Sequence, residues 1–236
     1  MKRIHAMLIA FALALYLLSN PVTAYAQQRR ASAGRARAAA ENEQERAVRA
    51  AFLQYKEAIL RQQGETAWQH VDANTARYYD EMRLLALNGS EKEARALSFV
   101  NKTTVLLLRH RVGLEGLRPM TAKDVFVYAV DKGMIGRDGV LKSNVGKVRV
   151  FADKASGVLL HEGRVAPFAY QFSKEDGQWK IDLTAILPSA NVAMKALIER
   201  EKLNEDEFLL LLVESVSGSK PPATIWQPLI EKQQGN

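Results

Sequence analysis

The spacing of the apolar residues changes along this chain, and that change constrains the fold more than any other feature of the sequence. Before Gly139 the apolar residues recur every three or four positions, which is typical of helices that bury one face. After Gly139 they alternate with polar residues, which is typical of half-buried strands. Helical spacing returns after Pro188. The sequence therefore predicts an α+β fold, in which N-terminal helices pack on a curved antiparallel meander and extra C-terminal helices follow.

The first helices are predicted by local signals. Gly64 suits the C-terminal cap of the first helix, because glycine readily adopts the left-handed conformation that often ends a helix. Asp72 or Asn74 can cap a later helix, which Asn88-Gly89 stops. The first helix itself is predicted from four apolar residues that are spaced four, three and four positions apart: Val48, Phe52, Tyr55 and Ile59.

Three further helices have recognisable start signals. Ser90 and Glu93 form a capping box, and we expect the helix that it opens to run to Val112. Pro188 begins another helix after the strands, because proline is favoured in a first helical turn. Asn204 can cap a last helix.

The alternating region predicts three or four strands joined by tight turns. The turns are expected from Asp153 to Gly157 and from Lys174 to Gly177. Pro167 has no amide hydrogen, so we expect it at a sheet edge or in a bulge. The segment from Gly136 to Gly139 is interpreted as a turn that precedes the strands. The expected strands span residues 147–152, 158–162, 164–173 and 178–186.

The hairpin from Tyr170 to Leu183 resembles part of a known family. An aromatic strand, the turn Asp176-Gly177 and the strand Trp179-Lys180-Ile181 follow one another. This order resembles the terminal hairpin of the nuclear-transport-factor-two-like superfamily, and the opening helices are also similar to those of that family. The resemblance covers about residues 44–187. It implies a cone-like fold, in which a bent sheet and the first helices enclose an apolar cavity.

The chain departs from a minimal member of this family in two places. The stretch between Gly89 and Val140 contains two extra helical segments, and the helices after Pro188 are also additional. Both additions have room to cover the open mouth of the cone. Members of the family include isomerases, dehydratases and non-catalytic binding or assembly proteins, so the fold alone does not determine the function.

Aromatic residues are the candidates for lining a ligand pocket. The adjacent Tyr78 and Tyr79 diverge by about 100° on a helix, so only one of them can face a cavity. The alternative for each candidate is ordinary packing in the core. The candidates are Trp68, Tyr78, Tyr79, Tyr170 and Trp179.

No group of residues predicts a catalytic, metal or cofactor site. An isomerase site of the resembled family needs a carboxylate base and acidic hydrogen-bond donors in a dry pocket. Asp72 and Asp182 are the available carboxylates, but Asp182 alternates with Trp179 and is expected to be solvated on the opposite face. The absence of cysteine excludes disulfides, thiol catalysis and cysteine-ligated metals. The remaining histidines lie far apart, and none has a partner at metal-ligand spacing: His70, His110 and His161.

The C-terminal segment, residues 219–236, offers a candidate docking site for a partner. Trp226 and Leu229 follow Pro221-Pro222, and tryptophan is a frequent anchor of protein interfaces. The alternative is that both side chains pack back on the domain.

The N-terminal sequence predicts export. Lys2 and Arg3 precede the apolar run Ala6–Leu18, and Ala24-Tyr25-Ala26 matches a cleavage site, so residues 1–26 are interpreted as a signal peptide. The alternative is an uncleaved membrane anchor, which needs about 20 apolar residues and therefore a longer run than this one. We expect residues 27–40 to form a disordered basic leader, residues 41–218 a single domain and residues 219–236 a tail.

The basic charge of the chain is concentrated near its N-terminus. The chain has 33 Lys and Arg against 26 Asp and Glu. Six of the basic residues and none of the acidic ones fall within residues 1–37, so 27 basic and 26 acidic residues remain in the rest. A nearly neutral domain without a basic, aromatic patch argues against nucleic-acid binding.

These patterns together predict a periplasmic or secreted protein with no transmembrane segment after signal cleavage. We expect a non-enzymatic binding or assembly module of the bacterial envelope that acts through an apolar cavity or a sheet face. Its partner would be a small apolar ligand or an envelope protein, and no cofactor is expected. One alternative is an isomerase or dehydratase of the cone fold with an aromatic-lined pocket. Another is a homodimer formed through the open sheet face.

Overall fold

The structure, a computed structural model, describes residue 29, residues 43–135 and residues 137–230. The chain divides into a unit of residues 1–46 and a compact unit of residues 47–236. The whole sheet and all helices that begin after residue 60 belong to the second unit. The predicted signal peptide, and all of the predicted leader except residue 29, lie outside the described residues.

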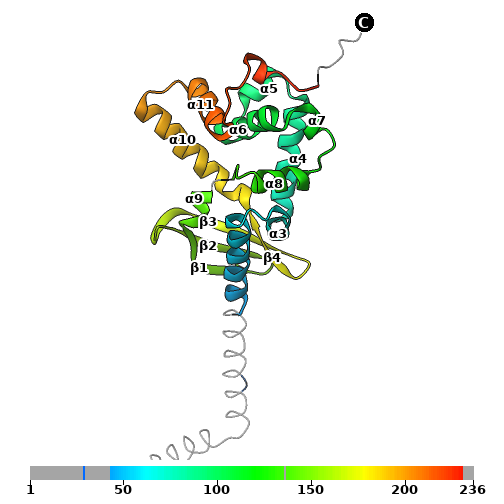
Figure 1. Cartoon of the computed structure of the whole chain (residues 1–236). Helices are drawn as coiled ribbons and strands as arrows, with labels where there is room; N and C mark the ends of the chain where they lie inside the picture. The colour runs from blue at the N-terminus through cyan, green and yellow to red at the C-terminus, as the bar shows by residue number, and fades with distance from the viewer. Residues whose placement is uncertain (1–28, 30–42, 136, 231–236) are drawn as a thin grey trace, which may run out of the picture. The chain divides into compact units, whose positions relative to one another are not determined.

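Helices make up most of the described chain (Figure 1). The first is described over residues 43–60. It is followed by α3 (Gly64–Trp68), α4 (Ala73–Asn88), α5 (Glu91–Ala96), α6 (Phe99–Leu107), the π-helical turn η1 (Leu108–Val112), α7 (Gly113–Leu117), α8 (Ala122–Asp131) and α9 (Arg137–Leu141). After the sheet come the 3-10 turn η2 (Leu183–Ile186), α10 (Leu187–Glu201), α11 (Glu205–Ser217) and the 3-10 turn η3 (Ala223–Trp226).

The predicted start signals of four helices are confirmed. Asp72 caps α4 by accepting a hydrogen bond from the backbone N–H of Thr75, and Ser90 opens α5 with a complete capping box. Pro188 lies in the first turn of α10. Asn204 accepts a hydrogen bond from the backbone of Glu207 and so caps α11.

The sheet is a four-stranded antiparallel meander in the order β1-β2-β3-β4, so the predicted α+β class is confirmed. The three connections are two-residue turns whose first residue has a positive φ: Ala152, Glu162 and Asp176. Pro167 lies where three residues of the third strand oppose one residue of the second, which confirms the expected bulge. The strands are β1 (Ser143–Phe151), β2 (Lys154–His161), β3 (Arg164–Glu175) and β4 (Gln178–Asp182).

Four predictions for the sheet are wrong in length. The first strand begins at Ser143 and not at residue 147, and β3 continues to Glu175, so the turn expected from Lys174 to Gly177 is shorter. The turn expected from Asp153 to Gly157 is also shorter, because Lys154 already pairs with Phe151. The last strand ends at Asp182 and does not continue to Ile186. Its end has a local cause, since the Asp182 carboxylate accepts a hydrogen bond from the backbone of Thr184 and starts the turn η2.

The predicted role of Gly64 as a helix cap is also wrong. Gly64 begins α3, and the residue with a positive φ after the first helix is Gln62. A Cβ atom on Gly64 would lie 2.7 Å from the Cα atom of Val127. Glycine at this position therefore allows α3 and α8 to approach closely.

Two further helix predictions need correction. The helix expected from Ser90 to Val112 breaks at Leu97, whose ψ is 160°. The break lets Leu97 pack against one hydrophobic cluster while Phe99 is buried in another. The predicted turn before the strands instead contains the short helix α9.

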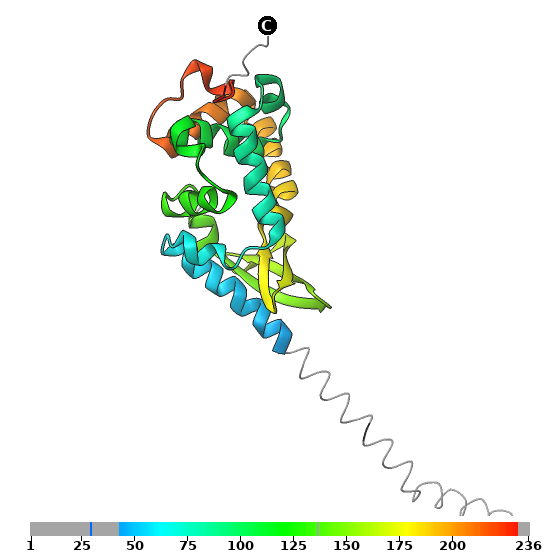
Figure 2. The same cartoon turned by 90° about the vertical axis from the view of Figure 1, so that its right-hand side faces the viewer.

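The first hydrophobic cluster lies between the first helix and the sheet. Figure 2 shows this helix along the sheet, and the rings of Phe52 and Tyr170 are 4.9 Å apart between the two layers. α3 and α8 complete the cluster with Ala67, Phe126 and Val130. Its largest fully buried side chains are Phe52, Phe126, Phe172 and Ile181.

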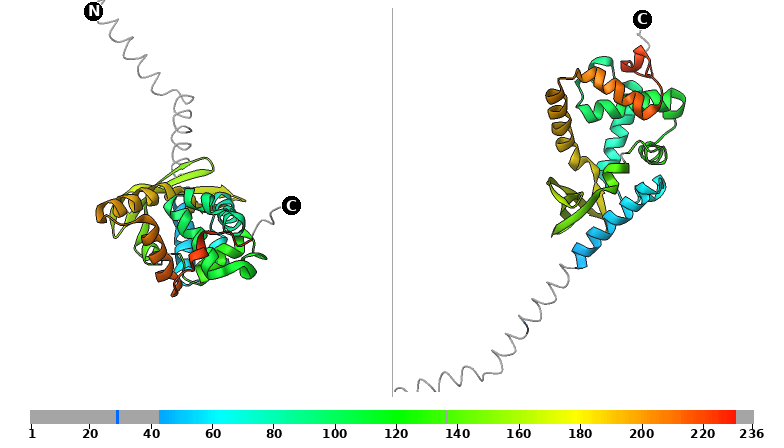
Figure 3. Two further views of the ribbon diagram at one scale, coloured as in Figure 1. Left: turned by 90° about the horizontal axis from the view of Figure 1, so that it is seen from above. Right: turned by 60° about the vertical axis from the view of Figure 1, so that its left-hand side comes forward.

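Two more clusters hold the other helices together. The second joins α5, α6, α10, α11 and η3, and Figure 3 shows α10 and α11 beside α6. The third joins α4, α6, α7 and α8. α4 links this helical part to the sheet, because Tyr79 packs against both the first and the third cluster.

Candidate functional site

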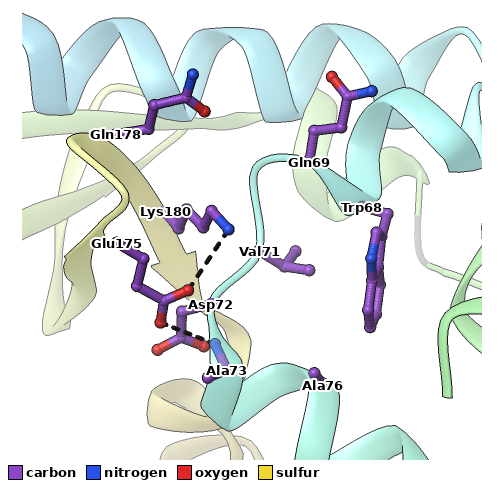
Figure 4. A pocket seen from close by; sticks show the side chains of 9 residues that line it. All are labelled: Trp68, Gln69, Val71, Asp72, Ala73, Ala76, Glu175, Gln178 and Lys180. Carbon is purple, nitrogen blue, oxygen red and sulfur yellow. Dashed lines mark hydrogen bonds and ion pairs between the residues drawn. The ribbon is translucent and has the colours of Figure 1, made fainter.

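A cleft of about 400 Å³ opens where the loop between α3 and α4 meets the hairpin of β3 and β4 (Figure 4). We name it the Asp72 cleft. Its volume lies in the range of small-molecule sites. It is lined by Trp68, Gln69, Val71, Asp72, Ala73, Ala76, Glu175, Gln178 and Lys180.

Backbone hydrogen bonds hold the loop against the edge of the sheet. Val71 forms a parallel bridge with Ile181 of β4. The N–H of Ile181 donates to the carbonyl of His70 at 2.8 Å, and the N–H of Asp72 donates to the carbonyl of Ile181 at 3.0 Å. The position of Asp72 in the cleft is therefore fixed from both sides.

Asp72 is a buried carboxylate that accepts several hydrogen bonds. It is only 2% exposed. Its Oδ1 accepts from the backbone N–H of Thr75 at 2.9 Å and from the Thr75 hydroxyl at 3.0 Å, and its Oδ2 accepts from the Ser173 hydroxyl at 3.2 Å. Burial, together with the like charge of Asp182, raises the pKa of Asp72, although these hydrogen bonds act in the opposite direction.

A chain of polar contacts continues from Asp72 through the sheet. Lys154 donates from Nζ to the Ser173 hydroxyl at 2.8 Å, and that hydroxyl donates onward to Asp72. Lys154 and Ser173 are direct partners in neighbouring strands. Neither residue lines the Asp72 cleft, so the pair supports the carboxylate from behind.

Glu175 and Lys180 form the opposite side of the Asp72 cleft. The backbone N–H of Ala73 donates to Glu175 Oε1 at 3.0 Å, and Lys180 Nζ lies 3.5 Å from Glu175 Oε2. Figure 4 shows both contacts as dashed lines. Two carboxylates, Asp72 and Glu175, therefore face the positive N-terminal end of α4.

The expectation that Asp182 is a solvated strand carboxylate is wrong. Asp182 accepts a hydrogen bond from the Asn74 side chain at 2.8 Å. It also accepts from the backbone N–H of Thr184 at 2.8 Å and from the Thr184 hydroxyl at 2.6 Å. Asp182 therefore ties the first turn of α4 to the end of β4.

Among the pocket candidates, Trp68 alone lines the Asp72 cleft. Its ring packs on Phe126, with 5.5 Å between the ring centroids. Trp179 is 5% exposed and belongs to the first hydrophobic cluster. Figure 4 shows the Trp68 ring across the cleft from Glu175 and Lys180, with Val71 between them.

The tyrosine candidates lie inside the fold, away from the Asp72 cleft. Tyr79 packs against the first and third clusters, and Tyr78 packs against the third, with its hydroxyl 3.1 Å from the Thr104 hydroxyl. The two rings meet edge to face with 5.3 Å between their centroids, so the expected divergence of the two side chains is wrong. Tyr170 packs against the first cluster from β3. Burial raises the pKa of each of these hydroxyls.

Tyr55 belongs with the interior tyrosines, although the sequence pattern indicated only that it is a core residue. Burial raises its pKa well above the usual value, and the nearby hydroxyls of Tyr79 and Tyr170 raise it further. Within the described residues, no Asp or His side chain hydrogen-bonds to Tyr55, Tyr79 or Tyr170.

The histidines lie apart in the fold. His110 contacts the hydroxyl of Ser219, while burial and the charge of Lys180 lower the pKa of His70. His161 ends β2 at the far side of the sheet. Within the part of the chain that the structure describes, no group of three acidic or histidine side chains could hold a metal ion.

Three other clefts are lined by described residues. One of about 400 Å³ is mainly apolar and lies between the bulge at Pro167 and the first turns of α10. One of about 360 Å³ lies along α11 beside Pro221, and one of about 280 Å³ lies between the first helix and His70. The cleft along α11 also has two acidic residues and a lysine in its lining, so the Asp72 cleft is distinguished from these three by its tryptophan and its buried carboxylate.

The predicted docking residues pack back on the domain. Trp226 is 5% exposed and is buried in the second cluster, where the guanidinium of Arg95 lies 4.1 Å above its ring. Leu229 packs against the third cluster, and its N–H lies 3.4 Å from the carbonyl of Ala86. This conformation corresponds to the packed alternative and leaves Trp226 inaccessible to a partner.

None of the helices described from residue 43 onward is both long and apolar enough to span a bilayer. The chain matches no protein-family model, no curated protein and no solved structure.

Proposed function

We propose that this chain is an exported, non-enzymatic binding module of the bacterial envelope and that it holds a small ligand in the Asp72 cleft. One observation carries the proposal. A buried carboxylate, an ion pair and an indole ring converge on one open cleft of about 400 Å³. A few fixed polar groups beside an aromatic wall are typical of small-molecule sites.

The contacts of the charged groups favour binding over catalysis. Asp72 already accepts hydrogen bonds from Thr75 and Ser173. Glu175 already pairs with Lys180 and accepts a hydrogen bond from the backbone N–H at the start of α4. A nucleophile needs a base within hydrogen-bond reach on the open side of a pocket. Among the residues that line this cleft, there is no such pair.

The proposal includes the cone-like architecture of the resembled family and the envelope location. The first helix packed along an antiparallel meander and the hairpin with the Asp176-Gly177 turn support the architecture. The run of residues 1–26 supports export. The interior of this fold is filled by packed aromatic side chains, so the ligand is expected at the cleft and not inside the sheet.

Native mass spectrometry of the protein tests the proposed function. The full chain is expressed with its N-terminal segment, recovered from the envelope fraction and ionised gently. A retained small molecule is expected. The variant Ala76→Trp fills the Asp72 cleft and should no longer retain the small molecule. The variant Ala193→Trp fills the apolar cleft beside α10 and should still retain it. Loss from Ala193→Trp alone would assign binding to the apolar cleft instead.

An isomerase or dehydratase remains the second candidate, and one observation favours it. Burial raises the pKa of Asp72 in an open cleft, which is a common property of catalytic carboxylates. An enzyme of this kind would exchange the α-protons of bound carbonyl compounds with solvent deuterium. Exchange that the parent chain catalyses and that Asp72→Asn abolishes would replace the binding proposal.

A further inference from the structure

We infer that the Asp72 cleft receives the ammonium group of an organic cation, which the carboxylates of Asp72 and Glu175 attract and the Trp68 ring contacts. This inference rests on the proposed function, because it names the chemical class of the ligand in the same cleft. Four observations on the lining residues support it.

The charge of the lining favours a cation. Two carboxylates, Asp72 and Glu175, face one ammonium group, that of Lys180, so the lining carries one excess negative charge. Behind the lining, Asp182 adds a negative charge close to Asp72 and Lys154 adds a positive charge through Ser173, so the excess of one negative charge is unchanged. A bound cation would relieve the repulsion between the carboxylates.

The ion pair inside the Asp72 cleft is loose. Lys180 lies 3.5 Å from Glu175, which is longer than the pairs Lys102–Glu205 and Lys142–Glu162 at 2.6 and 2.8 Å, although the exposed pair Lys195–Glu199 is longer still at 3.9 Å. Charge-assisted hydrogen bonds are typically about 2.7–2.9 Å long. Glu175 therefore retains capacity to accept from a second cation.

Three of the four backbone N–H groups in the first turn of α4 are already occupied. The N–H of Ala73 donates to Glu175, that of Thr75 donates to the Asp72 carboxylate, and that of Ala76 donates to the Asp72 carbonyl. A helix N-terminus attracts anions through such N–H groups. Because the protein's own carboxylates take these positions, a ligand carboxylate or phosphate would meet repulsion.

The Trp68 ring supplies a surface that suits a cation. It lines the Asp72 cleft and is held from behind by Phe126. Ala73 and Ala76 line the same cleft, and their small side chains fill little of it. A cation is attracted electrostatically to the face of an indole ring, and a methylated ammonium is attracted without strong competition from hydration.

Three probes of similar shape distinguish a cationic ligand from a neutral one and from an anionic one. Choline is the cation, 3,3-dimethylbutan-1-ol is its neutral isostere and 3,3-dimethylbutanoate is an anion of similar size. The chain has three tryptophans, so indole N–H signals in ¹H–¹⁵N spectra report on Trp68 directly. We expect the Trp68 signal to shift with choline at about 1–10 mM, with binding roughly tenfold weaker for the neutral probe and none for the anion.

Matched variants locate the interaction. Glu175→Gln should weaken choline binding by about fivefold, which is the scale of one charge contact near a surface. The binding of the neutral probe to this variant should be unchanged. Glu207→Gln, on α11, should change neither. Trp68→Phe should retain part of the choline binding and Trp68→Leu should lose it, and circular dichroism confirms that both variants fold.

Equal binding of choline and the neutral probe, stronger binding of the anion, or no binding of choline would each overturn the cation inference. The proposed function is judged separately. If native mass spectrometry finds a ligand that Ala76→Trp displaces while choline does not bind, the cleft still binds a ligand but that ligand is not an organic cation.

Discussion

Asp72 combines two roles, because the same carboxylate caps α4 and faces the cleft. The burial that positions it also disfavours its charged form, so its pKa in the folded protein is raised above the ordinary value of 3.8. In the pH window that begins at this value, the folded state binds more protons than the unfolded state. The free energy of unfolding contributed by Asp72 therefore falls as the pH rises through that window.

We predict that Asp72→Asn removes this pH dependence while keeping the cap, since asparagine is an equally good capping residue. In urea denaturation between pH 4 and pH 7, the variant should gain stability relative to the parent as the pH rises. Asp72→Ala also removes the pH dependence but loses the cap, so it should be about 1–2 kcal/mol less stable than Asp72→Asn at every pH. A constant difference between the parent and Asp72→Asn would show that the carboxylate carries no desolvation penalty.

Arg109 is a buried cation that is satisfied only by backbone carbonyls among the described residues. It is 4% exposed, and burial lowers its pKa. It lies in η1, a π-helical turn. Its guanidinium donates to the carbonyls of Leu85, Ala86, Gly89, Ile225 and Trp226.

We predict that Arg109→Met destabilises the protein by about 3–5 kcal/mol, because it leaves buried carbonyls without donors. Arg109→Lys keeps the charge but supplies fewer donors, so its cost should be intermediate. Arg111→Met is the matched control, since Arg111 lies in the same turn and makes one bond, to the carbonyl of Val216. Urea denaturation should show a cost below about 1.5 kcal/mol for this control. Equal costs at both positions would contradict the assigned role of Arg109.

At the scale of elements, the contact between α3 and α8 depends on a missing side chain. The Gly64 backbone N–H donates to Asp131 Oδ1 at 2.7 Å, and its Cα faces Val127 of α8. Gly64→Ala would place a methyl group 2.7 Å from the Val127 backbone. Backbone atoms give way less easily than the end of a flexible side chain.

We predict that Gly64→Ala lowers stability by about 1–3 kcal/mol, the usual cost of overpacking. Gly139→Ala is the matched control, because a Cβ on Gly139, within α9, would meet nothing within 4 Å. That change should be neutral or stabilise by up to about 1 kcal/mol. Thermal unfolding of both variants measures the difference, and a Gly64→Ala protein as stable as the parent would contradict it.

The elements also show what sequence can predict. The caps at Asp72, Ser90 and Asn204 depend on residues three or fewer positions away, so their signals are complete in the local sequence. The break at Leu97 and the contact of Gly64 depend on packing against distant elements, so no local pattern indicates them.

In the candidate site, too, local features could be predicted from the sequence and contacts between distant elements could not. Asp72 could be predicted as a cap, and Trp68 as an aromatic candidate, from nearby residues. Their approach to Glu175 and Lys180 spans about a hundred residues and depends on the bridge between Val71 and Ile181. The Lys180–Glu175 ion pair is local to the predicted hairpin, but the cleft itself arises from that non-local pairing, which one sequence does not specify.

At the scale of the compact unit, three hydrophobic clusters are joined by shared helices. α4 and α8 each contribute side chains to the cluster at the sheet and to the third cluster. α6 contributes to both helical clusters, through Leu106 and Leu107 to the second and through Val105 to the third. Because each helix spans a boundary between clusters, loss of one cluster should weaken the next.

We therefore predict that the compact unit unfolds in one cooperative transition. Trp68 and Trp179 report on the sheet cluster, and Trp226 reports on the second cluster. Labelling with 5-fluorotryptophan gives each a separate ¹⁹F signal in the same molecule, which three single Trp→Phe variants assign. The three urea midpoints should agree within about 0.2 M, the precision of such fits.

Arg109→Met provides the decisive comparison, because it loosens the contact between α4 and the segment of η3 without touching the sheet. In a cooperative unit, all three midpoints shift together to lower urea. If only the Trp226 signal shifts while those of Trp68 and Trp179 stay in place, the helical part and the sheet part unfold independently. The Asp72 cleft, built from α3, α4 and the sheet, would then survive loss of the C-terminal helices, and ligand binding by the variant would remain unchanged.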